Sequence, residues 1–389
     1  MTAGFDFDRL VDRRGSGSYK WDSASDLKII PLWVADMDFT AAPAIIRALQ
    51  KRVDHGVFGY VKVPEEYYRA LTAWNIRHHN WTIDPDMVIY TSGVVPAVSA
   101  IIKALTRPGD GVIVNTPAYN CFFSSIRNNS CTIVENPLLR TDAGDSFSYS
   151  IDFESLEKAC ADPANKVFLL CNPHNPTGRI WSREELERIA VICHRHGVTV
   201  VSDEIHCELT LPGKEYTPYA TVDSEAVVCC SPSKAFNIAG LQIANIIAPS
   251  QPVRDIIDRA INDNEVCDVN PFGVTALIAA YTEGEEWLDA LRSYIAGNYR
   301  RLVDFFSTEM PQLKVCSLEA TYLAWVDITP LGIDSVSLEK FALDTEKVWV
   351  NSGAMYGTEG YIRINMACPA SRLLEGLRRL SRAVSNLGK

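Results

Sequence analysis

Two serines and a lysine follow the apolar stretch 226–230, which we predict to be a buried strand. The serines are Ser231 and Ser233, and the lysine is Lys234. A primary amine at the end of a strand forms an imine with a carbonyl compound when its pKa is lowered. Hydroxyl groups and free backbone N–H groups suit an anion such as a phosphate. The stretch therefore indicates covalent chemistry at a lysine beside an anion site, although Ser-x-Ser-Lys alone is equally typical of an ordinary loop.

Polar or flexible residues also stand at the ends of other apolar runs. We predict strands at 87–91, 111–115, 166–171 and 198–202, separated by helical segments. The residues that follow these strands are Gly93, Tyr119, Asn172, Asn175 and Asp203. In an open parallel sheet, ligands bind outside the carboxyl ends of the strands. Because all these residues fall at such ends, we expect them to surround one site together with Lys234.

The residue types match the needs of pyridoxal phosphate (PLP), which carries an aldehyde, a phosphate and a pyridine ring. Asp203 can keep the ring nitrogen protonated, because a fixed carboxylate raises the pKa of that nitrogen. The alternative role of Asp203 is that of a helix N-cap. Tyr119 offers a face on which the ring stacks, and Asn172 or Asn175 offers a neutral donor to the phenolic oxygen. PLP is therefore the predicted cofactor.

The phosphate and the substrate have candidates of their own. The backbone N–H groups of Gly93 and Val94 lie at a predicted helix start and, with the two serines, would bind the phosphate. Arg363 lies in an apolar strand, and a buried arginine needs an anion. We favour a bidentate pair with the carboxylate of an amino-acid substrate over a structural ion pair. His174 and His206, which lie beside these loops, are expected to be structural.

Alternating strand and helix patterns predict an α/β fold with a mostly parallel central sheet and helices on both faces. A capping box of Ser182 and Glu185 opens a helix that Gly197 ends. Two interpretations of segment 31–39 stand equal: its acidic turn 36–38 caps a helix that begins near Pro43, or the segment lines a pocket. Further helices are expected at 65–79, 96–106, 285–306 and 370–385.

We divide the chain into three regions. Residues 1–45 form an N-terminal arm and part of a small domain, residues 46–285 a large cofactor-binding domain, and residues 286–389 a C-terminal small α+β domain. Strands are expected in the last region at 322–327, 347–350 and 361–365. The long helix 285–306 is expected to link the two domains.

Composition narrows the class of protein. The net charge of −11 argues against nucleic acid or an anionic membrane as the main partner, and no apolar run reaches the length of a membrane helix. The eleven cysteines are scattered, several lie inside apolar runs, and none forms a C-x-x-C pair. We therefore expect reduced thiols, no metal site and no secretory signal, as in a cytoplasmic enzyme.

Taken together, these motifs resemble the fold type I PLP enzymes, the aspartate aminotransferase superfamily, over nearly the whole chain. The residues that carry the resemblance are 172–178, 202–204, 231–234 and Arg363. It implies the PLP-dependent transferase fold. In the cofactor site, Lys234 is then the imine-forming lysine, Asp203 the pyridinium partner and Asn175 the donor to the phenolic oxygen. Tyr119 is the stacking ring, and Arg363 is the ligand of the substrate α-carboxylate. Tyr60 looks like the tyrosine that reaches the phosphate in the neighbouring subunit, which implies a homodimer with shared active sites.

Within the superfamily, segments 31–39, 202–206 and 233–241 look like the bacterial cystathionine β-lyase and C–S lyase subgroup. Many aminotransferases carry an arginine for the phosphate eight residues after the lysine, whereas this chain has Gln242 there. The phosphate then depends more on hydroxyls, backbone N–H groups and Tyr60. Segment 31–39 is expected to line the pocket, with Ala35 in contact with the substrate, as are Arg363 and Asn175.

The implied reaction is an α,β-elimination on cystathionine, cysteine or a related S-conjugate. Lys234 removes the Cα proton, and a thiolate leaves from Cβ with a proton from Lys234 or from a tyrosine such as Tyr119. The remaining fragment hydrolyses to pyruvate and ammonia. The first rival is an aminotransferase, which uses the same residues, and the second is a regulatory protein that only senses PLP or an amino acid. Gln242 and segment 31–39 favour the lyase, and no basic segment for DNA is present.

Overall fold

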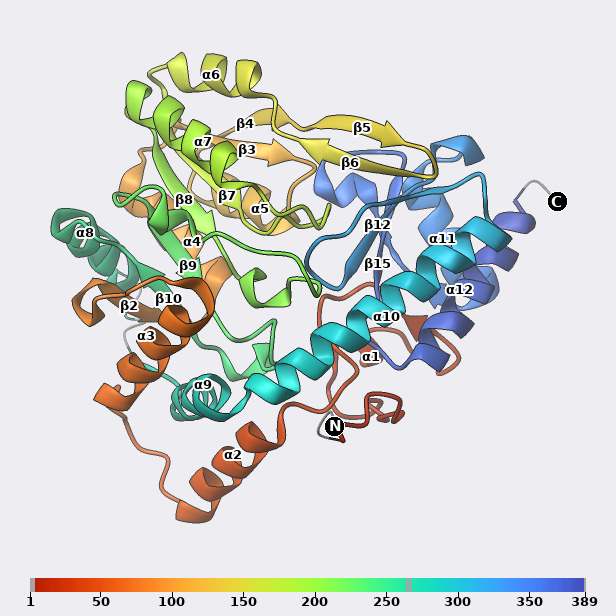
Figure 1. The fold of residues 1–389 in the computed structure, drawn as a ribbon, viewed down its shortest axis with the longest axis horizontal. Helices are drawn as coiled ribbons and strands as arrows, with labels where there is room; N and C mark the ends of the chain where they lie inside the picture. Colours follow the sequence, from red (N-terminus) through yellow and green to blue (C-terminus); the bar gives the residue numbers. More distant parts are fainter. Residues whose placement is uncertain (1–3, 264, 266–267, 388–389) are drawn as a thin grey trace.

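A seven-stranded sheet forms the centre of the computed structural model, which describes residues 4–263, 265 and 268–387. Its strand order is β2-β10-β9-β8-β7-β3-β4, and β10 runs antiparallel to both of its neighbours while the other neighbouring pairs are parallel. The strands are β2 (Val88–Thr91), β3 (Gly111–Thr116), β4 (Thr132–Pro137), β7 (Asn165–Cys171), β8 (Thr199–Asp203), β9 (Val227–Cys230) and β10 (Ala244–Ile247). The predicted mostly parallel sheet is confirmed (Figure 1).

Helices cover both faces of this sheet because neighbouring residues of each buried strand point to opposite sides. Val112 and Val114 of β3 belong to the cluster that includes the apolar face of α4 (Val94–Leu105). Ile113, between them, belongs to a separate cluster with α7 (Arg183–His196). The first face also carries α5 (Asn120–Asn128) and α8 (Gln251–Asn262), and the second carries α6 (Phe153–Ala161).

Of the two predictions about helix ends, the one for α7 is confirmed, and the predicted cap of α2 is wrong. The capping box at Ser182 and Glu185 opens α7, and Gly197 ends it in a left-handed conformation at φ 67°. Helix α2 (Pro43–His55) begins where expected, but its N-cap is Ala42, without a side-chain hydrogen bond. The acidic turn 36–38 does not cap this helix, because its carboxylates bind cations of the N-terminal arm instead.

A second sheet has six strands in the order β14-β15-β12-β11-β6-β5. The strands are β5 (Leu139–Ala143), β6 (Ser146–Ser150), β11 (Lys314–Cys316), β12 (Leu323–Asp327), β14 (Asn351–Ser352) and β15 (Tyr361–Asn365). The hairpin β5–β6 comes from within the range 46–285, yet it joins this sheet through a parallel pairing of β6 with β11. The three-part division of the chain stays a prediction, and this hairpin is the element that crosses it.

The remaining elements surround the two sheets. They are α1 (Tyr19–Asp22), α3 (Glu65–His79), α9 (Pro271–Glu283), α10 (Glu285–Glu309), α11 (Ser335–Glu346), α12 (Ala370–Ser385), the paired strands β1 (Ile30–Pro31) and β13 (Val348–Trp349), and the 3₁₀ turns Pro85–Met87, Cys207–Leu209, Tyr219–Thr221, Ala239–Leu241, Thr329–Leu331 and Gly353–Tyr356. Helix α10 runs from α9 toward α12 (Figure 1), and its role as a link between two domains stays a prediction. No helix among the described residues combines the length and the apolar character needed to cross a membrane.

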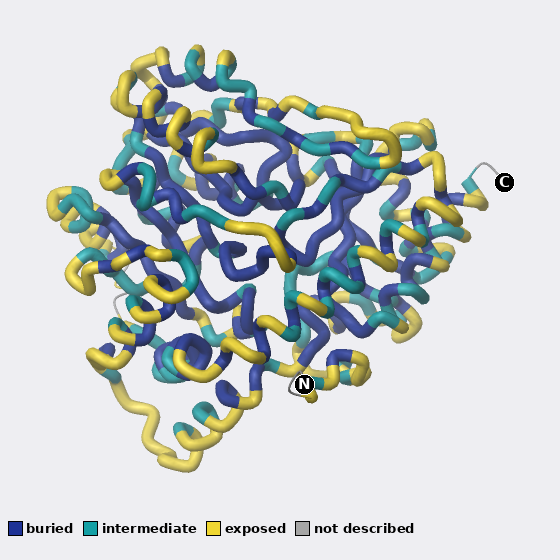
Figure 2. Tube along the Cα trace, viewed as in Figure 1, coloured by how far each residue is buried: buried dark blue, intermediate teal, exposed yellow. Residues whose placement is uncertain are grey.

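Helix α2 and its connection to α3 project from the body of the molecule (Figure 1). Residues 54–60 in this projection are all exposed, as the yellow tube in Figure 2 shows. They include Val57, Phe58 and Tyr60, whose side chains are large and at least partly apolar. Such a surface is typical of a contact with another protein chain.

Candidate active site

Lys234 lies in the loop after β9, half-buried, and its Nζ donates to the carbonyl of Ala35 at 2.7 Å. Burial and the positive charge of Arg363 together lower the pKa of the lysine to about 8, although Asp36 and Asp203 act in the opposite direction. About a tenth of the amine is therefore unprotonated at pH 7, far more than for a lysine of ordinary pKa. This is the property that an imine-forming or proton-abstracting lysine needs.

Asp203 ends β8 and is buried. Burial raises the pKa of its carboxyl to about 6, while a hydrogen bond from the Ile205 N–H and the charge of Lys234 act to lower it. Oδ1 accepts the Ile205 N–H at 3.1 Å, which closes a turn and does not start a long helix. The carboxylate therefore lies between strand ends with capacity to accept from a bound ring nitrogen.

Arg363 on β15 is 3% exposed and has no carboxylate partner among the described residues. Its Nη1 donates to Asn175 Oδ1 at 3.1 Å, and its Nη2 donates to the Trp33 carbonyl at 3.0 Å. The ring of Tyr356 lies 4.8 Å from the guanidinium carbon. A buried guanidinium held only by neutral oxygens retains the ability to pair with the carboxylate of a ligand.

Three polar atoms in this region are buried without a hydrogen-bond partner among the described residues: Asn172 Oδ1, His206 Nδ1 and Arg363 Nε. Buried polar atoms are nearly always paired in folded proteins, so unpaired ones at one place indicate a polar ligand. Burial, with a smaller effect of the charges of Lys234 and Arg363, lowers the pKa of His206 to about 3. His206 is therefore neutral. It lies in the site, although the sequence analysis expected it to be only structural.

The anion side of the site is formed by the start of α4 and the loop after β9. Gly93 is the N-cap of α4 and provides no side-chain cap, so the first N–H groups of the helix remain available. Ser231 Oγ donates to the Ile243 carbonyl at 2.6 Å and accepts the Ser233 N–H at 3.0 Å. Because its proton is committed to the loop, Ser231 is a weaker candidate for a phosphate donor than Ser233.

The two tyrosines differ in position. Tyr119 is the half-buried N-cap of α5, and burial, together with Cys121 nearby, raises the pKa of its hydroxyl. It therefore keeps its proton at neutral pH. Tyr60 is 94% exposed in the projecting connection. Within one chain, no hydrogen bond of the described residues joins Tyr60 to the site.

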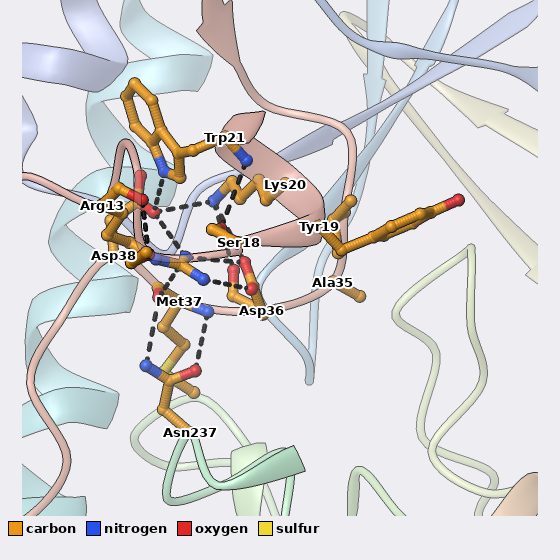
Figure 3. Close-up of polar contacts among 12 residues, drawn as sticks. Arg13, Ser18, Tyr19, Lys20, Trp21, Ala35, Asp36, Met37, Asp38 and Asn237 are labelled. Atoms are coloured by element: carbon orange, nitrogen blue, oxygen red, sulfur yellow. Dashed lines mark hydrogen bonds and ion pairs between the residues drawn. The ribbon is translucent and has the colours of Figure 1, made fainter. Parts of the chain in front are cut away.

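Segment 33–38 of the N-terminal arm lies against Lys234, and a group of charges holds its outer side (Figure 3). Asp38 is buried and accepts from Arg13 at 2.9 Å, Lys20 at 3.2 Å and Trp21 Nε1 at 2.8 Å. Arg372 of α12 approaches its second oxygen at 3.1 Å. The arm is thus part of the site and is fixed to the C-terminal helix.

Other candidates do not join the site. His174 is buried with its Nδ1 bonded to Thr177 Oγ1 at 2.8 Å, and burial lowers its pKa to about 3. His79, Cys207 and Glu208 are the one group of metal-ligand types within 4.8 Å of one another among the described residues. In that group Glu208 Oε1 already accepts from His79 Nε2 at 2.8 Å, which is the geometry of a buried ion pair.

Lys234 and Asp203 follow strands of the mostly parallel sheet, and Arg363, without a carboxylate partner among the described residues, reaches them from β15 of the second sheet. This arrangement agrees with a sequence match over residues 28–380 to the family Aminotransferase class I and II. The chain belongs to this family. The predicted PLP-dependent transferase fold is thereby confirmed, since solved structures of family relatives share it over nearly the whole length.

Several proteins with close overall similarity to this chain are named cystathionine beta-lyases or C–S lyases. Cystathionine beta-lyase PatB of Bacillus subtilis is 42% identical over 389 residues, which cover 97% of this chain and all of PatB. Cystalysin from Treponema denticola, whose structure contains pyridoxal 5′-phosphate, has a TM-score of 0.94 and 36% identity, covering 99% of this chain and all of cystalysin. The PLP-bound C–S lyase from Staphylococcus hominis has a TM-score of 0.91 and 32% identity, covering 98% of each chain.

Sequence reasoning missed residues that contact the site through the backbone or from distant elements. Asn237 bonds to segment 33–38, and Tyr322 donates its hydroxyl to the Ala35 carbonyl at 2.9 Å. Asn237 lies only three residues after Lys234, and that proximity was the available signal. Tyr322 is 88 positions away from Lys234 in the sequence numbering, so nothing in the sequence connects them.

Proposed function

We propose that this protein is a PLP-dependent C–S β-lyase that cleaves cystathionine, cysteine or a related S-conjugate to a thiol, pyruvate and ammonia. The observation that carries the proposal is the pairing of a lysine of pKa about 8 with a buried arginine that lacks a carboxylate partner among the described residues. The lyase names of PatB and of the Staphylococcus hominis enzyme support the reaction.

The residues present fit the cofactor. The buried carboxylate of Asp203 supplies a partner for a ring nitrogen, and the uncapped start of α4 supplies N–H donors for a phosphate. The unpaired buried atoms beside them indicate that a polar ligand belongs there. Lys234 would hold the aldehyde carbon, and Asp203 would hold a proton at the ring nitrogen. Asn175 would donate to the phenolic oxygen, with Asn172 beside it, and Tyr119 would cover one ring face. When bound, PLP withdraws electrons from the substrate Cα.

Each protein group then has a defined task toward the substrate. Arg363 binds the α-carboxylate, and Asn175 and the Trp33 carbonyl orient the guanidinium through Nη1 and Nη2. The free amine of Lys234 takes the Cα proton as a general base. The C–S bond breaks, the thiolate takes a proton from Lys234 or Tyr119, and the released fragment hydrolyses to pyruvate and ammonia.

We further propose a cytoplasmic homodimer with shared active sites. Tyr60, 94% exposed, lies in the projecting connection between α2 and α3, and this position suits a contact with the phosphate in a second copy. The exposed Val57 and Phe58 beside it provide apolar surface for the interface. The ten described cysteines are all free thiols, which fits a reducing compartment.

The proposal is tested by incubating the purified holoenzyme with L-cystathionine in the absence of any keto acid. We expect equal amounts of pyruvate and thiol over many turnovers, and loss of both in Lys234→Ala. Conversion of the cofactor to its amine form without pyruvate, reversed by a keto acid, would identify an aminotransferase instead. Binding of PLP without either reaction would leave only the regulatory alternative.

A further inference from the structure

The two cations of the site donate to one short stretch of backbone. Lys234 Nζ donates to the Ala35 carbonyl at 2.7 Å, and Arg363 Nη2 donates to the Trp33 carbonyl at 3.0 Å. Both acceptors belong to segment 33–38. The position of this segment therefore fixes the rest position of the lysine amine and the plane of the guanidinium.

On the lysine side, Asn237 holds the segment (Figure 3). Its Oδ1 accepts the Met37 N–H at 3.0 Å, and its Nδ2 donates to the carbonyls of Met37 at 3.1 Å and Phe39 at 2.8 Å. The amide thus pairs with the backbone in the way a neighbouring strand would. Because Asn237 lies three residues after Lys234, it sets the distance between the lysine loop and the Ala35 carbonyl.

On the arginine side, Asn365 has the corresponding place. It lies two residues after Arg363 on β15, and its Nδ2 donates to the carbonyls of Val34 and Asp36. Its Oδ1 accepts the Ala367 N–H at 2.7 Å, which fixes the orientation of the amide. Asn365 is 1% exposed, so each of these bonds is shielded from water.

We propose that Asn237 and Asn365 are positioning residues with separate tasks, and the proposal rests on the roles of Lys234 and Arg363 given above. Asn237 places the Ala35 carbonyl, which receives the Lys234 amine whenever the amine is free, and so governs proton transfer. Asn365 binds the carbonyl of Val34, the residue next to Trp33, and thereby helps to place the Trp33 carbonyl that orients Arg363, and so governs binding of the substrate carboxylate.

At Asn237, one substitution removes the side-chain amide without straining the backbone. Asn237 has φ 54°, in the left-handed region where glycine is accommodated without strain. Asn237→Gly therefore removes the amide and leaves the backbone free to keep its course. We expect kcat to fall about 10- to 100-fold, the scale of a general base displaced by about 1 Å, with KM within about twofold of wild type.

At the second position, Asn365→Ala removes the donor to segment 33–38, and Asn365→Ser is the milder variant if alanine folds poorly. We expect KM to rise about tenfold, because a less well oriented guanidinium loses part of a bidentate bond, with kcat within about threefold. Substitution of Asn237 is therefore expected to change mainly kcat, and substitution of Asn365 mainly KM.

A matched control removes a similar amide elsewhere. Asn129 Nδ2 donates to the carbonyls of Ser99 at 3.2 Å and Ser125 at 2.8 Å and joins α4 to α5 away from segment 33–38. Asn129→Gly should lower the melting temperature while kcat and KM stay within about twofold of wild type. The absorbance of the bound cofactor is recorded for each variant, and we expect the Asn237 and Asn365 variants to keep the wild-type spectrum.

Hydrogen–deuterium exchange of the cofactor-free protein gives a readout that does not depend on turnover. The peptide that contains Met37 should exchange faster in Asn237→Gly, because the Met37 N–H loses its acceptor, and should exchange at the wild-type rate in Asn129→Gly. The same change in kcat and KM for both asparagines, or unchanged exchange at Met37, would overturn the proposal. Absence of pyruvate from the wild-type enzyme would instead refute the proposed function, while the exchange result would still report on Asn237.

Discussion

Asn175 and Arg363 lie 188 residues apart in the sequence and meet through a hydrogen bond of 3.1 Å from Nη1 to Oδ1. A guanidinium only donates, so the bond fixes which way the amide of Asn175 faces. Its Nδ2 group is then directed away from the arginine and remains available to an acceptor oxygen. One residue thus connects the carboxylate-binding arginine to the place of the cofactor.

The first prediction concerns that bond. Asn175→Asp places a carboxylate against Arg363, and this internal partner competes with the substrate carboxylate. We expect KM for L-cystathionine to rise about 10- to 100-fold, corresponding to a charge-assisted hydrogen bond of about 1.5–3 kcal/mol. Steady-state kinetics measure the effect. The control is Asn175→Ala, which lacks the competing charge, and an equal rise in KM for both variants would contradict the mechanism.

The second prediction concerns the ionisation of Lys234 in the cofactor-free protein. Burial is the main cause that lowers its pKa to about 8, so the reactive neutral amine should dominate above that pH. Arg363→Met should raise the midpoint of Lys234, because the arginine charge is the second cause of the lowered pKa. Acylation rates across the pH range, followed by peptide mass spectrometry, measure both midpoints. A midpoint that stays unchanged or falls in Arg363→Met would contradict the electrostatic coupling.

The third prediction concerns Asp38 and acid stability. Burial alone would raise the pKa of Asp38, but Lys20, the Trp21 N–H, Arg372 and Arg13 outweigh burial and lower it. The carboxylate therefore contributes stability that is present above its unfolded pKa of about 3.9 and is lost as pH falls through the lower folded pKa. Asp38→Asn should lower the free energy of unfolding by about 3–5 kcal/mol at pH 7, because it leaves buried cations unpaired.

Denaturant unfolding of wild type and Asp38→Asn at neutral and acidic pH measures this contribution. The difference between the two proteins should shrink below about pH 4, where the Asp38 carboxyl of the unfolded chain takes up a proton while the folded carboxyl stays ionised to lower pH. A difference that is the same at pH 7 and in acid would show that Asp38 acts through packing and not through its charge.

The fourth prediction concerns the shared site. If Tyr60 acts in the neighbouring subunit, Tyr60→Ala and Lys234→Ala should each be inactive or nearly so as pure proteins. A mixed dimer of the two variants contains one site with both native residues. We therefore expect mixing under subunit exchange to restore up to about a quarter of the wild-type activity per subunit for statistical association. No recovery in a mixture that forms mixed dimers by mass spectrometry would place Tyr60 in its own subunit's site or outside any site.

The sequence predicted the elements whose signal is local. The strand ends that carry Asn172, Asp203 and Lys234 follow apolar runs of four to seven residues, and their parallel pairing in the structure brings those ends to one edge. The helix limits at Ser182 and Gly197 depend on contacts within a few residues, and the sequence therefore carries them. The hairpin β5–β6 has no local signal for the sheet it joins, because its partner β11 lies far along the chain.

The acidic turn 36–38 illustrates why local reasoning failed elsewhere. Its nearest helix begins at Pro43, and capping was the interaction available within a few residues. In the folded protein, Asp38 is surrounded by cations from the arm and from α12, and several charges near a buried carboxylate outweigh one helix terminus. Because residues far apart in the sequence bury Asp38 and supply its cations, no short stretch of sequence could predict this environment.

By itself, the sequence determined which chemistry is available: a lysine, a carboxylate, amides and an arginine, each fixed to a strand or loop by periodicity and turn residues. Only the tertiary structure decided their state. It buried Lys234 enough to lower its pKa to about 8, left Arg363 without a carboxylate partner among the described residues, and brought segment 33–38 against both. The physical reason is that residue type and spacing are local, whereas desolvation, charge pairing and backbone contacts depend on what the rest of the chain places nearby.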